Sequence, residues 1–179
     1  MSECSTEYTK SSLSPEAIDK IVGSVVGEYV FVETGTNIGA GTQVALDAGF
    51  KFIYTMEKLE RFYLKAAERF KDSDRVLTMH CDSPKGLRKI CWAIQDPCFF
   101  WLDAHTPSSA PLWKEISIIK SRGYREDLIV IDDCRMMRKE LDWGRDTTMQ
   151  QILDDLKGYE ITYVDSHNAK DDILVAQGP

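Results

Sequence analysis

Acidic residues recur at one kind of position in this sequence, directly after a short run of β-branched and aromatic residues. These positions are Glu33, Glu57, Asp82, Asp103 and the pair Asp132 and Asp133. Any one of them, taken alone, could cap a helix or lie in an ordinary loop. If the runs are parallel strands of one sheet, their ends share an edge and the acids line a single rim. Because crowded carboxylates repel one another, such a rim favours a cationic ligand or a metal ion.

Asp103, Asp132 and Asp133 form the sharpest group, because they follow two strand-like runs that we expect to be neighbours in the sheet. Three carboxylates with room for water suit Mg²⁺ or Ca²⁺ better than a softer metal. His105 lies two residues after Asp103, and the ordinary pKa of histidine is near neutrality. It is a candidate general base or further metal ligand, although a loop histidine bonded to backbone fits the same position.

A glycine-containing turn from Glu33 to Thr42 follows the first strand-like run and reads E-x-G-x-x-x-G-x-x-T. The dinucleotide fingerprint G-x-G-x-x-G fails in either register, and the phosphate loop G-x-x-x-x-G-K-[ST] does not occur. Gly35 and Gly39 allow the backbone to approach a ligand closely. The carboxylate of Glu33 disfavours a pyrophosphate and suits a cationic group, and a tight turn without a ligand is the alternative.

Strand and helix signals alternate along the chain. Runs of β-branched and aromatic residues predict strands at 29–32, 52–56, 76–79, 98–102, 128–131, 159–164 and 172–176. Apolar periodicity and capping signals predict helices at 14–27, 42–48, 59–70, 84–94, after 111 and from 147. Five strand–helix units require right-handed crossovers, and the last two runs can pair antiparallel. We therefore expect an α/β three-layer sandwich with a doubly wound, mainly parallel seven-stranded sheet and a C-terminal antiparallel strand pair.

The length and composition of the chain argue against several classes of protein. The 179 residues fit one domain, which we place at 14–179 behind a flexible tail of residues 1–13. A net charge of −7 argues against unaided nucleic-acid binding. No apolar run approaches the ~18 residues of a membrane span, and no secretory signal opens the chain. Five cysteines, an odd number with no C-x-x-C pair, predict reduced thiols and a cytoplasmic location.

The turn from Glu33 to Thr42 resembles the first motif of the class I S-adenosylmethionine-dependent methyltransferases. It is most similar to the variant of the small-molecule, catechol-type O-methyltransferases, which also carry E-x-G-x-x-x-G. The resemblance extends from Tyr29 to Gln177 and includes the seven-strand order with its terminal antiparallel pair. It implies a Rossmann-like fold that binds S-adenosylmethionine at the carboxyl ends of the strands.

The resemblance also implies roles for individual residues. The carboxylate and glycines of the first motif hold the methionine end of the cofactor. Glu57, which lies 22 positions after Gly35, binds the ribose hydroxyls, and Asp82 with Ser83 lies near the adenine. The full set of implied cofactor-binding residues is Glu33, Gly35, Thr36, Asn37, Gly39, Thr42, Glu57, Lys58, Asp82, Ser83 and Asp103.

A metal site is implied in the same way. In that family an acid after the fourth strand and an acid–amide pair after the fifth ligate a divalent metal, which corresponds to Asp103, Asp132 and Asp133. This chain has Asp133 where the family commonly has asparagine, and that difference adds negative charge. The alternative is that one aspartate contacts the methyl donor while the others cap helices.

The leading hypothesis is S-adenosylmethionine-dependent methyl transfer to a small-molecule oxygen or nitrogen, with Asp103 and His105 as catalytic residues and a divalent cation such as Mg²⁺ assisting. A non-catalytic binding module for S-adenosylmethionine or a nucleotide is the first alternative, because 179 residues leave little chain for a substrate-selecting lid. An NAD-dependent oxidoreductase is the second, although the failed glycine fingerprint weighs against it. The expected partner is the small-molecule methyl acceptor, with no nucleic acid and no membrane, and a homodimer would bury part of the bare scaffold.

Overall fold

The computed structural model describes residues 10–105, 110–138 and 147–178. Its strands are β1 (Val30–Thr34), β2 (Phe52–Glu57), β3 (Val76–His80), β4 (Cys98–Leu102), β5 (Leu128–Ile131), β6 (Glu160–Val164) and β7 (Ile173–Gln177). Its α-helices are α1 (Pro15–Ile21), α2 (Ala40–Ala48), α3 (Glu60–Arg69), α4 (Ser83–Ile90), α5 (Leu112–Lys120), α6 (Cys134–Arg138) and α7 (Met149–Asp155). A 3₁₀ helix spans Gly23–Glu28. The predicted alternation of strands and helices is confirmed.

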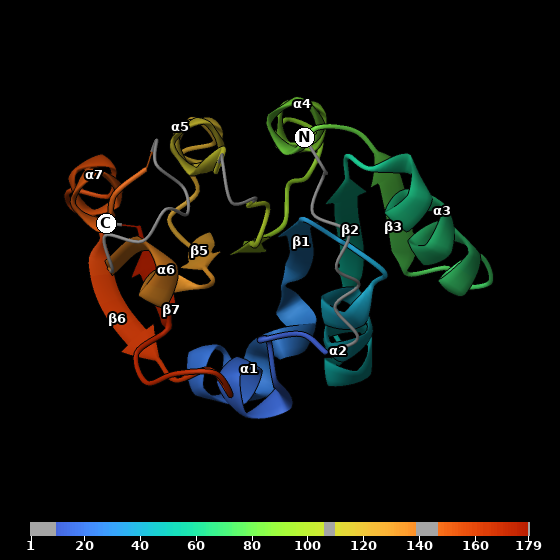
Figure 1. Ribbon diagram of the computed structural model, residues 1–179, viewed down its shortest axis with the longest axis horizontal. Coiled ribbons are helices and arrows are strands. Elements are labelled where there is room, and N and C mark those ends of the chain that lie inside the picture. Colours follow the sequence, from blue (N-terminus) through green and yellow to red (C-terminus); the bar gives the residue numbers. More distant parts are fainter. Residues whose placement is uncertain (1–9, 106–109, 139–146, 179) are drawn as a thin grey trace.

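The seven strands form one sheet in the order β3-β2-β1-β4-β5-β7-β6 (Figure 1). Strands β1 to β5 run parallel, and β7 pairs antiparallel with both β5 and β6. The order reverses between β1 and β4, which is the switch point where ligands bind in doubly wound sheets. The predicted fold class, including the terminal antiparallel pair, is confirmed.

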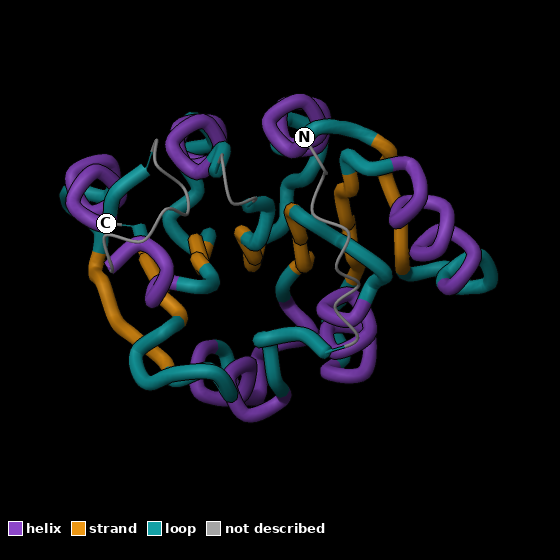
Figure 2. Tube along the Cα trace, viewed as in Figure 1, coloured by secondary structure: helices purple, strands orange, loops and turns teal. Residues whose placement is uncertain are grey.

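Helices cover both faces of the sheet (Figure 2). An apolar core lies between the helices and the sheet on each face. Side chains of α4, α5 and α7 pack on one face against Val32, Phe100 and their neighbours. On the other face, α1 and α2 pack against Phe31, Phe99 and Trp101. Consecutive residues of β1 and β4 point to opposite faces and are all buried, which explains why β4 is apolar throughout and β1 is apolar as far as Val32. Helix α3 packs beside β2 and β3.

Two local predictions were incomplete. The first helix was expected to continue to Gly27, but α1 ends at Ile21 because Gly23 adopts a left-handed φ of 52°, and the chain continues as the 3₁₀ helix. The predicted N-cap is confirmed, since the Ser14 hydroxyl accepts from the Ala17 amide at 3.2 Å. Helix α6 was not predicted, because its five residues carry too little apolar periodicity.

Packing begins upstream of the predicted domain start. Leu13 is fully buried in the core beside Ala17 and Ile18, and Ser12 is buried as well. The boundary at residue 14 and the tail over 1–13 stay predictions, and residues 1–9 lie outside the described residues.

Two further features concern the cysteines and the lengths of the helices. Cys81, Cys91, Cys98 and Cys134 all carry free thiols, and three of them are buried; Cys4 lies outside the described residues. Over 10–105, 110–138 and 147–178, the structure contains no helix with the length and apolar character that crossing a membrane requires.

Candidate active site

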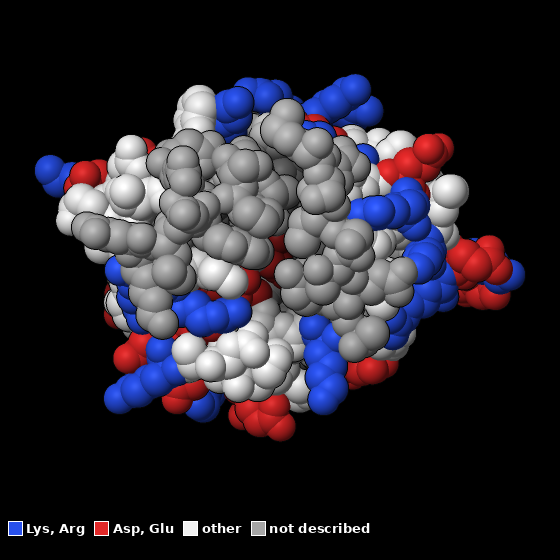
Figure 3. All heavy atoms as spheres, viewed as in Figure 1, with Lys and Arg blue, Asp and Glu red and all other residues white. Residues whose placement is uncertain are grey.

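The carboxyl ends of β1, β2, β4 and β5 lie at one edge of the sheet, as their parallel register requires. Thr34 pairs with Met56 on one side and with Leu102 on the other, and Leu102 pairs with Ile131. The predicted acids lie beside these residues in the sequence, so they gather along the same edge. Figure 3 shows acidic side chains in a hollow at the middle of this face.

The turn after β1 is held tightly against both neighbouring strands. The amides of Gly35 and Thr36 donate to the carbonyl oxygen of Met56 at 2.9 and 3.1 Å. Gly35 has a left-handed φ of 83°, and an added Cβ would lie 2.5 Å from the carbonyl oxygen of Asp103. Gly39, with the same φ, forms the N-cap of α2. Glycine is therefore required at position 35 for its conformation and for the close approach of the residue after β4.

We expect Gly35→Ala to lower the free energy of unfolding by at least about 2 kcal/mol, because the left-handed φ costs roughly 1 kcal/mol and the added methyl group overlaps backbone. Gly49→Ala is the matched control. Gly49 is also left-handed, at φ 94°, but nothing lies within 4 Å of an added Cβ, so only the conformational cost of about 1 kcal/mol is expected. Urea denaturation measures both, and equal losses at the two positions would contradict the close approach.

Glu33 stabilises the turn through hydrogen bonds of its side chain. Its Oε2 accepts hydrogen bonds from Thr42 Oγ1 at 2.5 Å and from Thr55 Oγ1 at 2.6 Å, and the hydroxyl of Thr36 bonds in turn to that of Thr55. The side chain is buried, and this burial raises the pKa of Glu33 to about 7. Of the implied cofactor residues, Glu33, Thr36 and Thr42 therefore form the internal support of the turn.

Glu57 lies at the rim and joins the first turn to the end of β2. Its Oε2 accepts from the Asn37 amide at 2.7 Å, and its Oε1 accepts from the Leu59 amide at 2.8 Å. The residue keeps 8% of its surface exposed. A carboxylate held by two backbone amides has a defined orientation and retains lone pairs for a further donor.

Asp82 follows the end of the neighbouring strand. The Cys81 amide donates to the carbonyl oxygen of Glu57 at 3.0 Å, which brings Asp82 beside the end of β2. Asp82 is exposed at the N-terminus of α4, whereas Ser83 is buried. Lys58 is exposed, and its carbonyl oxygen lies 3.2 Å from His80 Nε2. The implied ribose and adenine residues thus lie on adjacent strand ends.

Asp103, His105 and Asp133 form a compact group after β4 and β5. His105 Nε2 lies 2.8 Å from Asp133 Oδ2, and His105 Nδ1 lies 3.4 Å from Asp103 Oδ1. Burial, with the charges of Asp132 and Asp133, raises the pKa of Asp103 well above its ordinary value. Burial alone would raise the pKa of Asp133, but the hydrogen bond from His105 and the charge of Arg135 lower it. Opposite shifts in adjacent carboxyl groups are typical of sites that handle protons.

Arg135 compensates part of the negative charge of this group, on the Asp133 oxygen that His105 does not contact. It pairs with Asp133 Oδ1 at 2.6 Å and also with Asp172 Oδ2. Asp172 is fully buried at the start of β7 and accepts from the Arg135 amide at 2.9 Å and from the Ser166 hydroxyl at 2.7 Å. These bonds hold the guanidinium in place on the first turn of α6.

Asp132 is buried at the centre of the rim. The hydroxyl of Ser12, 120 positions away in the sequence, donates to its Oδ2, while Oδ1 has no hydrogen-bond partner within the described residues. Burial, followed by the charge of Asp133, raises the pKa of Asp132 to about 7. An unpaired carboxylate oxygen at this position marks a place that a cationic group would stabilise.

The predicted metal ligands divide between two overlapping groups. Candidate ligand atoms of Asp103, His105 and Asp133 lie within 4.8 Å of one another, and so do those of Asp132, Asp133 and Asp172. Asp133 belongs to both. Its left-handed φ of 56° favours aspartate, asparagine or glycine and turns the chain from β5 into α6.

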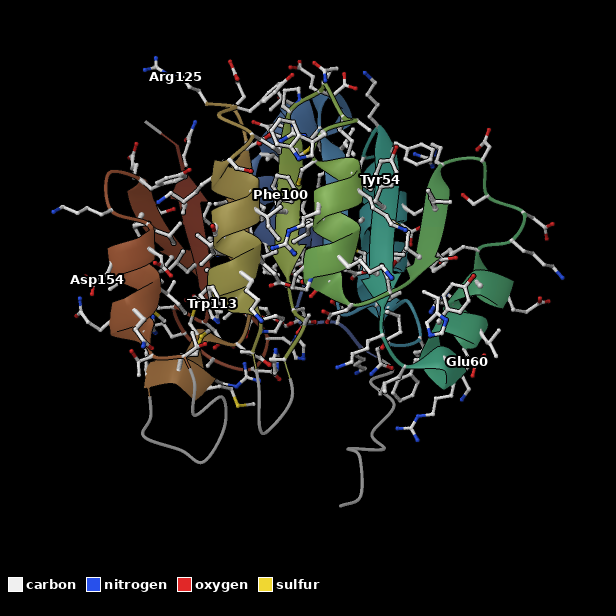
Figure 4. The ribbon with its side chains drawn as sticks, turned by 90° about the horizontal axis from the view of Figure 1, so that it is seen from above. Tyr54, Glu60, Phe100, Trp113, Arg125 and Asp154 are labelled. Atoms are coloured by element: carbon white, nitrogen blue, oxygen red, sulfur yellow. The ribbon has the colours of Figure 1, made fainter. Side chains whose placement is uncertain are left out.

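A pocket opens beside the acidic group. Its apolar wall is formed by Leu102, Ala104, Ala110, Leu112, Met136 and Met137. His105, Asp132 and Asp133 line its polar part. Trp113, which Figure 4 labels near the same end of the molecule, is not among the lining residues.

Glu115 is a buried acid that we did not identify from sequence. It lies on α5 and has no exposed surface, and neither carboxylate oxygen has a well-formed hydrogen bond to another described residue. Burial raises its pKa to about 7, although the hydroxyls of Ser83 and Thr34 oppose that shift. A signal was present, because position 115 falls on the apolar stripe of the helix three residues after Leu112.

Stability is expected to fall as the pH rises from about 4.5 to about 7, because Glu115 remains protonated in the folded state while the unfolded chain loses its proton. We expect Glu115→Gln to match the parent protein near pH 5 and to exceed its free energy of unfolding at pH 8 by roughly 1–3 kcal/mol. Glu28→Gln, at an exposed position, is the control and should show no such pH-dependent difference. Denaturation at both pH values measures the effect, and a gain that is equal at pH 5 and pH 8 would contradict it.

Known proteins match this chain in structure but not in sequence. No protein-family model matches it, and neither does any curated protein. A putative O-methyltransferase from Klebsiella pneumoniae matches with a TM-score of 0.68 and 14% identity over 92% of this chain and 79% of that one. An O-methyltransferase from Bacillus cereus in complex with SAH (S-adenosylhomocysteine) matches with 0.66 and 16%, over 87% and 76%. A precorrin-6y C5,15-methyltransferase from Geobacter metallireducens matches with 0.66 and 17%, over 99% and 94%.

This chain has the class I methyltransferase fold. The resemblance found in the turn from Glu33 to Thr42 is thereby confirmed at the level of the fold. Identities of 14–17% show no more than the architecture, and the names of these proteins differ in the kind of reaction, since two are O-methyltransferases and the third is a precorrin-6y C5,15-methyltransferase. The fold by itself therefore assigns no reaction and no acceptor to this chain.

Proposed function

We propose that this chain is an S-adenosylmethionine-dependent methyltransferase acting on an oxygen or nitrogen atom of a small molecule. One observation carries the proposal: the glycine turn, Glu57 and the group of Asp103, His105 and Asp133 lie at one edge of the sheet, beside an apolar pocket. The three features correspond to a cofactor seat, a proton-handling group and an acceptor site. Their convergence at the switch point agrees with where doubly wound sheets bind ligands.

The residues that would hold the cofactor suit its charge. S-adenosylmethionine supplies, when bound, a methyl group on a positively charged sulfur, and it also carries an ammonium. Within the group after β4 and β5, the ion pairs of Arg135 go to Asp133 and Asp172 rather than to Asp103 or Asp132, and the Oδ1 of Asp132 is unpaired among the described residues. Glu57 is oriented by two backbone amides and suits a vicinal diol such as that of a ribose.

The pocket supports a small acceptor with an apolar body. Six apolar side chains line one part of it, and His105 with two aspartates lines the other. An anionic acceptor, including a nucleic-acid backbone, would meet uncompensated negative charge there, and the whole chain has a net charge of −7. A neutral hydroxyl compound or an amine therefore fits better.

His105 is the residue placed to take the proton of the acceptor. Its ring lines the pocket, and Asp133 holds the ring through the 2.8 Å contact at Nε2. Methyl transfer forms a bond from the acceptor oxygen or nitrogen to carbon and breaks the carbon–sulfur bond, while the acceptor proton passes to His105. An aspartate that orients a histidine base is a recurring arrangement, and base catalysis of this kind contributes roughly 10²–10⁴-fold.

The predicted divalent cation fits these residues only in part. Ligand atoms are close enough together, but both oxygens of Asp133 already bond to His105 and Arg135. Mg²⁺ favours six oxygen ligands in near-octahedral geometry. Because it would compete with these two side chains for Asp133, no step of the proposed reaction is assigned to a metal.

Calorimetry with S-adenosylmethionine and S-adenosylhomocysteine tests the proposal first, and we expect saturable binding of both. Turnover is then followed with a panel of small phenols, alcohols and amines, by detecting S-adenosylhomocysteine as product. The absence of heat with either compound at high micromolar concentration would remove the proposal. Binding without turnover on the whole panel would support the non-catalytic binding module instead, and a thermal shift with NAD alone would support the oxidoreductase.

A further inference from the structure

We infer that Arg135 occupies the position that a divalent cation takes between the acids of this rim, so that the chain performs its reaction without a bound metal. The inference rests on the proposed function only for the reaction itself. The arrangement of charges that carries it is present whether or not the protein binds S-adenosylmethionine.

The first argument is the position of the guanidinium. Asp132, Asp133 and Asp172 present oxygen atoms within 4.8 Å of one another, which is the spacing of a metal site. Arg135 contacts two of these three acids through a single nitrogen, at 2.6 Å from Asp133 Oδ1 and also at Asp172 Oδ2. A cation of fixed charge therefore already lies among the atoms that would ligate an ion.

The second argument is that the backbone holds Arg135 there. Its own amide donates to Asp172 Oδ1 at 2.9 Å, and the Cys134 amide donates to the Asp172 carbonyl oxygen at 2.9 Å. The Ser166 hydroxyl adds a 2.7 Å bond to the same carboxylate. Because Asp172 is fully buried, its charge needs a permanent partner, and Arg135 supplies it as part of the fold rather than as a mobile surface side chain.

The third argument is charge balance and ligand availability. Asp133 already bonds to His105 on one oxygen and to Arg135 on the other, so an ion on either oxygen would compete with a side chain for the same carboxylate. An ion in the group of Asp132, Asp133 and Asp172 would lie close to a guanidinium of the same sign in a partly buried site, where repulsion is strong. Arg135 compensates Asp133 and Asp172, which leaves Asp103 and Asp132 to the cationic methyl donor.

One consequence concerns the acceptor. A divalent metal in such a site would select compounds that chelate it with two neighbouring oxygens. With Arg135 in that position, a single hydroxyl or amino group is sufficient, because His105 takes the proton and no chelation is required.

Ion binding tests the inference directly, with Mn²⁺ as the paramagnetic probe and Mg²⁺ by calorimetry. The parent protein is expected to bind neither saturably at submillimolar concentration and to show no thermal shift with them. Arg135→Gln removes the positive charge, and we expect its Mn²⁺ affinity to rise on the order of tenfold or more, with a Mn²⁺-dependent rise in melting temperature. Arg125→Gln is the matched control, since Arg125 is exposed at the opposite end of the strands (Figure 4), and it should behave as the parent does.

A second variant covers the case in which the buried Asp172 destabilises Arg135→Gln. The double variant Arg135→Gln, Asp172→Asn removes both members of the pair and keeps Asp103, His105, Asp132 and Asp133. We expect it to gain Mn²⁺ binding as well. Submillimolar binding of Mn²⁺ or Mg²⁺ by the parent protein would overturn the inference, as would no gain in either folded variant. Failure of the parent protein to bind S-adenosylhomocysteine would remove the proposed function but leave this result standing.

Discussion

Arg122→Met is expected to lower the free energy of unfolding by about 3–5 kcal/mol, the usual cost of removing one partner from a buried ion pair. The Arg122 side chain is only 2% exposed, and its Nε pairs with Asp127 Oδ2 at 2.7 Å. Its two terminal nitrogens donate to the carbonyl oxygens of Cys91, Ile94 and Asp96 at 2.8 to 3.1 Å. The substitution leaves these carbonyl oxygens without their donor and the buried Asp127 carboxylate without its counter-charge. Urea denaturation measures the loss.

Two further variants separate this effect from a general sensitivity of the region. Arg125→Met, three residues away and exposed, should change the free energy of unfolding by no more than about 0.5 kcal/mol. Arg122→Met combined with Asp127→Asn removes the unpaired charge and should recover part of the loss, because the asparagine oxygen can still accept from the Cys98 amide, now 2.9 Å from Asp127 Oδ1. A loss below about 1 kcal/mol for Arg122→Met alone would show that the guanidinium does not brace this end of the sheet.

Glu57→Ala is expected to weaken binding of S-adenosylhomocysteine by at least about 100-fold, which makes it the variant with the largest expected effect on ligand binding. The estimate assumes the proposed function, in which Glu57 would accept two charge-assisted hydrogen bonds from the ribose, each worth roughly 1.5–3 kcal/mol. The change also releases the Asn37 amide and the Leu59 amide, so the turn loses its connection to β2. Calorimetry measures the dissociation constants of parent and variant.

Glu60→Ala is the control for this prediction, because Glu60 is an exposed acid three residues away on the first turn of α3. It should leave the affinity unchanged. Melting curves of both variants establish that they are folded, and Glu57→Gln should lose affinity to an intermediate degree because one acceptor oxygen remains. A Glu57→Ala protein that is folded and binds S-adenosylhomocysteine as the parent does would show that the ribose role belongs to another residue.

Much of the fold was predictable because its signals are local. Every predicted strand is present within a few residues of its expected bounds, and the Ser14 cap and the antiparallel β6–β7 pair were both anticipated. Short apolar runs that lie between helical stripes have few other structures open to them. The errors lie where local signals are weak: at Gly23, whose left-handed φ breaks a helix that its apolar stripe would continue, and in the five-residue α6.

The position of the candidate site was predictable from the sequence, but the hydrogen bonds and ion pairs within it were not. Parallel strands bring Glu57, Asp103 and Asp132 to one edge, and that follows from the order of elements alone. The order of elements does not determine which of these acids face a ligand. Glu33 turned out to support the turn through two threonine hydroxyls, and the fully buried Glu115 was missed.

The amino-acid sequence by itself determined the strands, the helices, the glycine turn and the edge of the sheet where acids collect, because each depends on residues close together in the chain. Only the tertiary structure decided how those acids are compensated. Ser12 meets Asp132 across 120 positions and Arg135 meets Asp172 across 37, and packing of the whole sheet sets both contacts. Charge compensation acts through space over a few ångströms, so it depends on distances that no local pattern in the chain encodes.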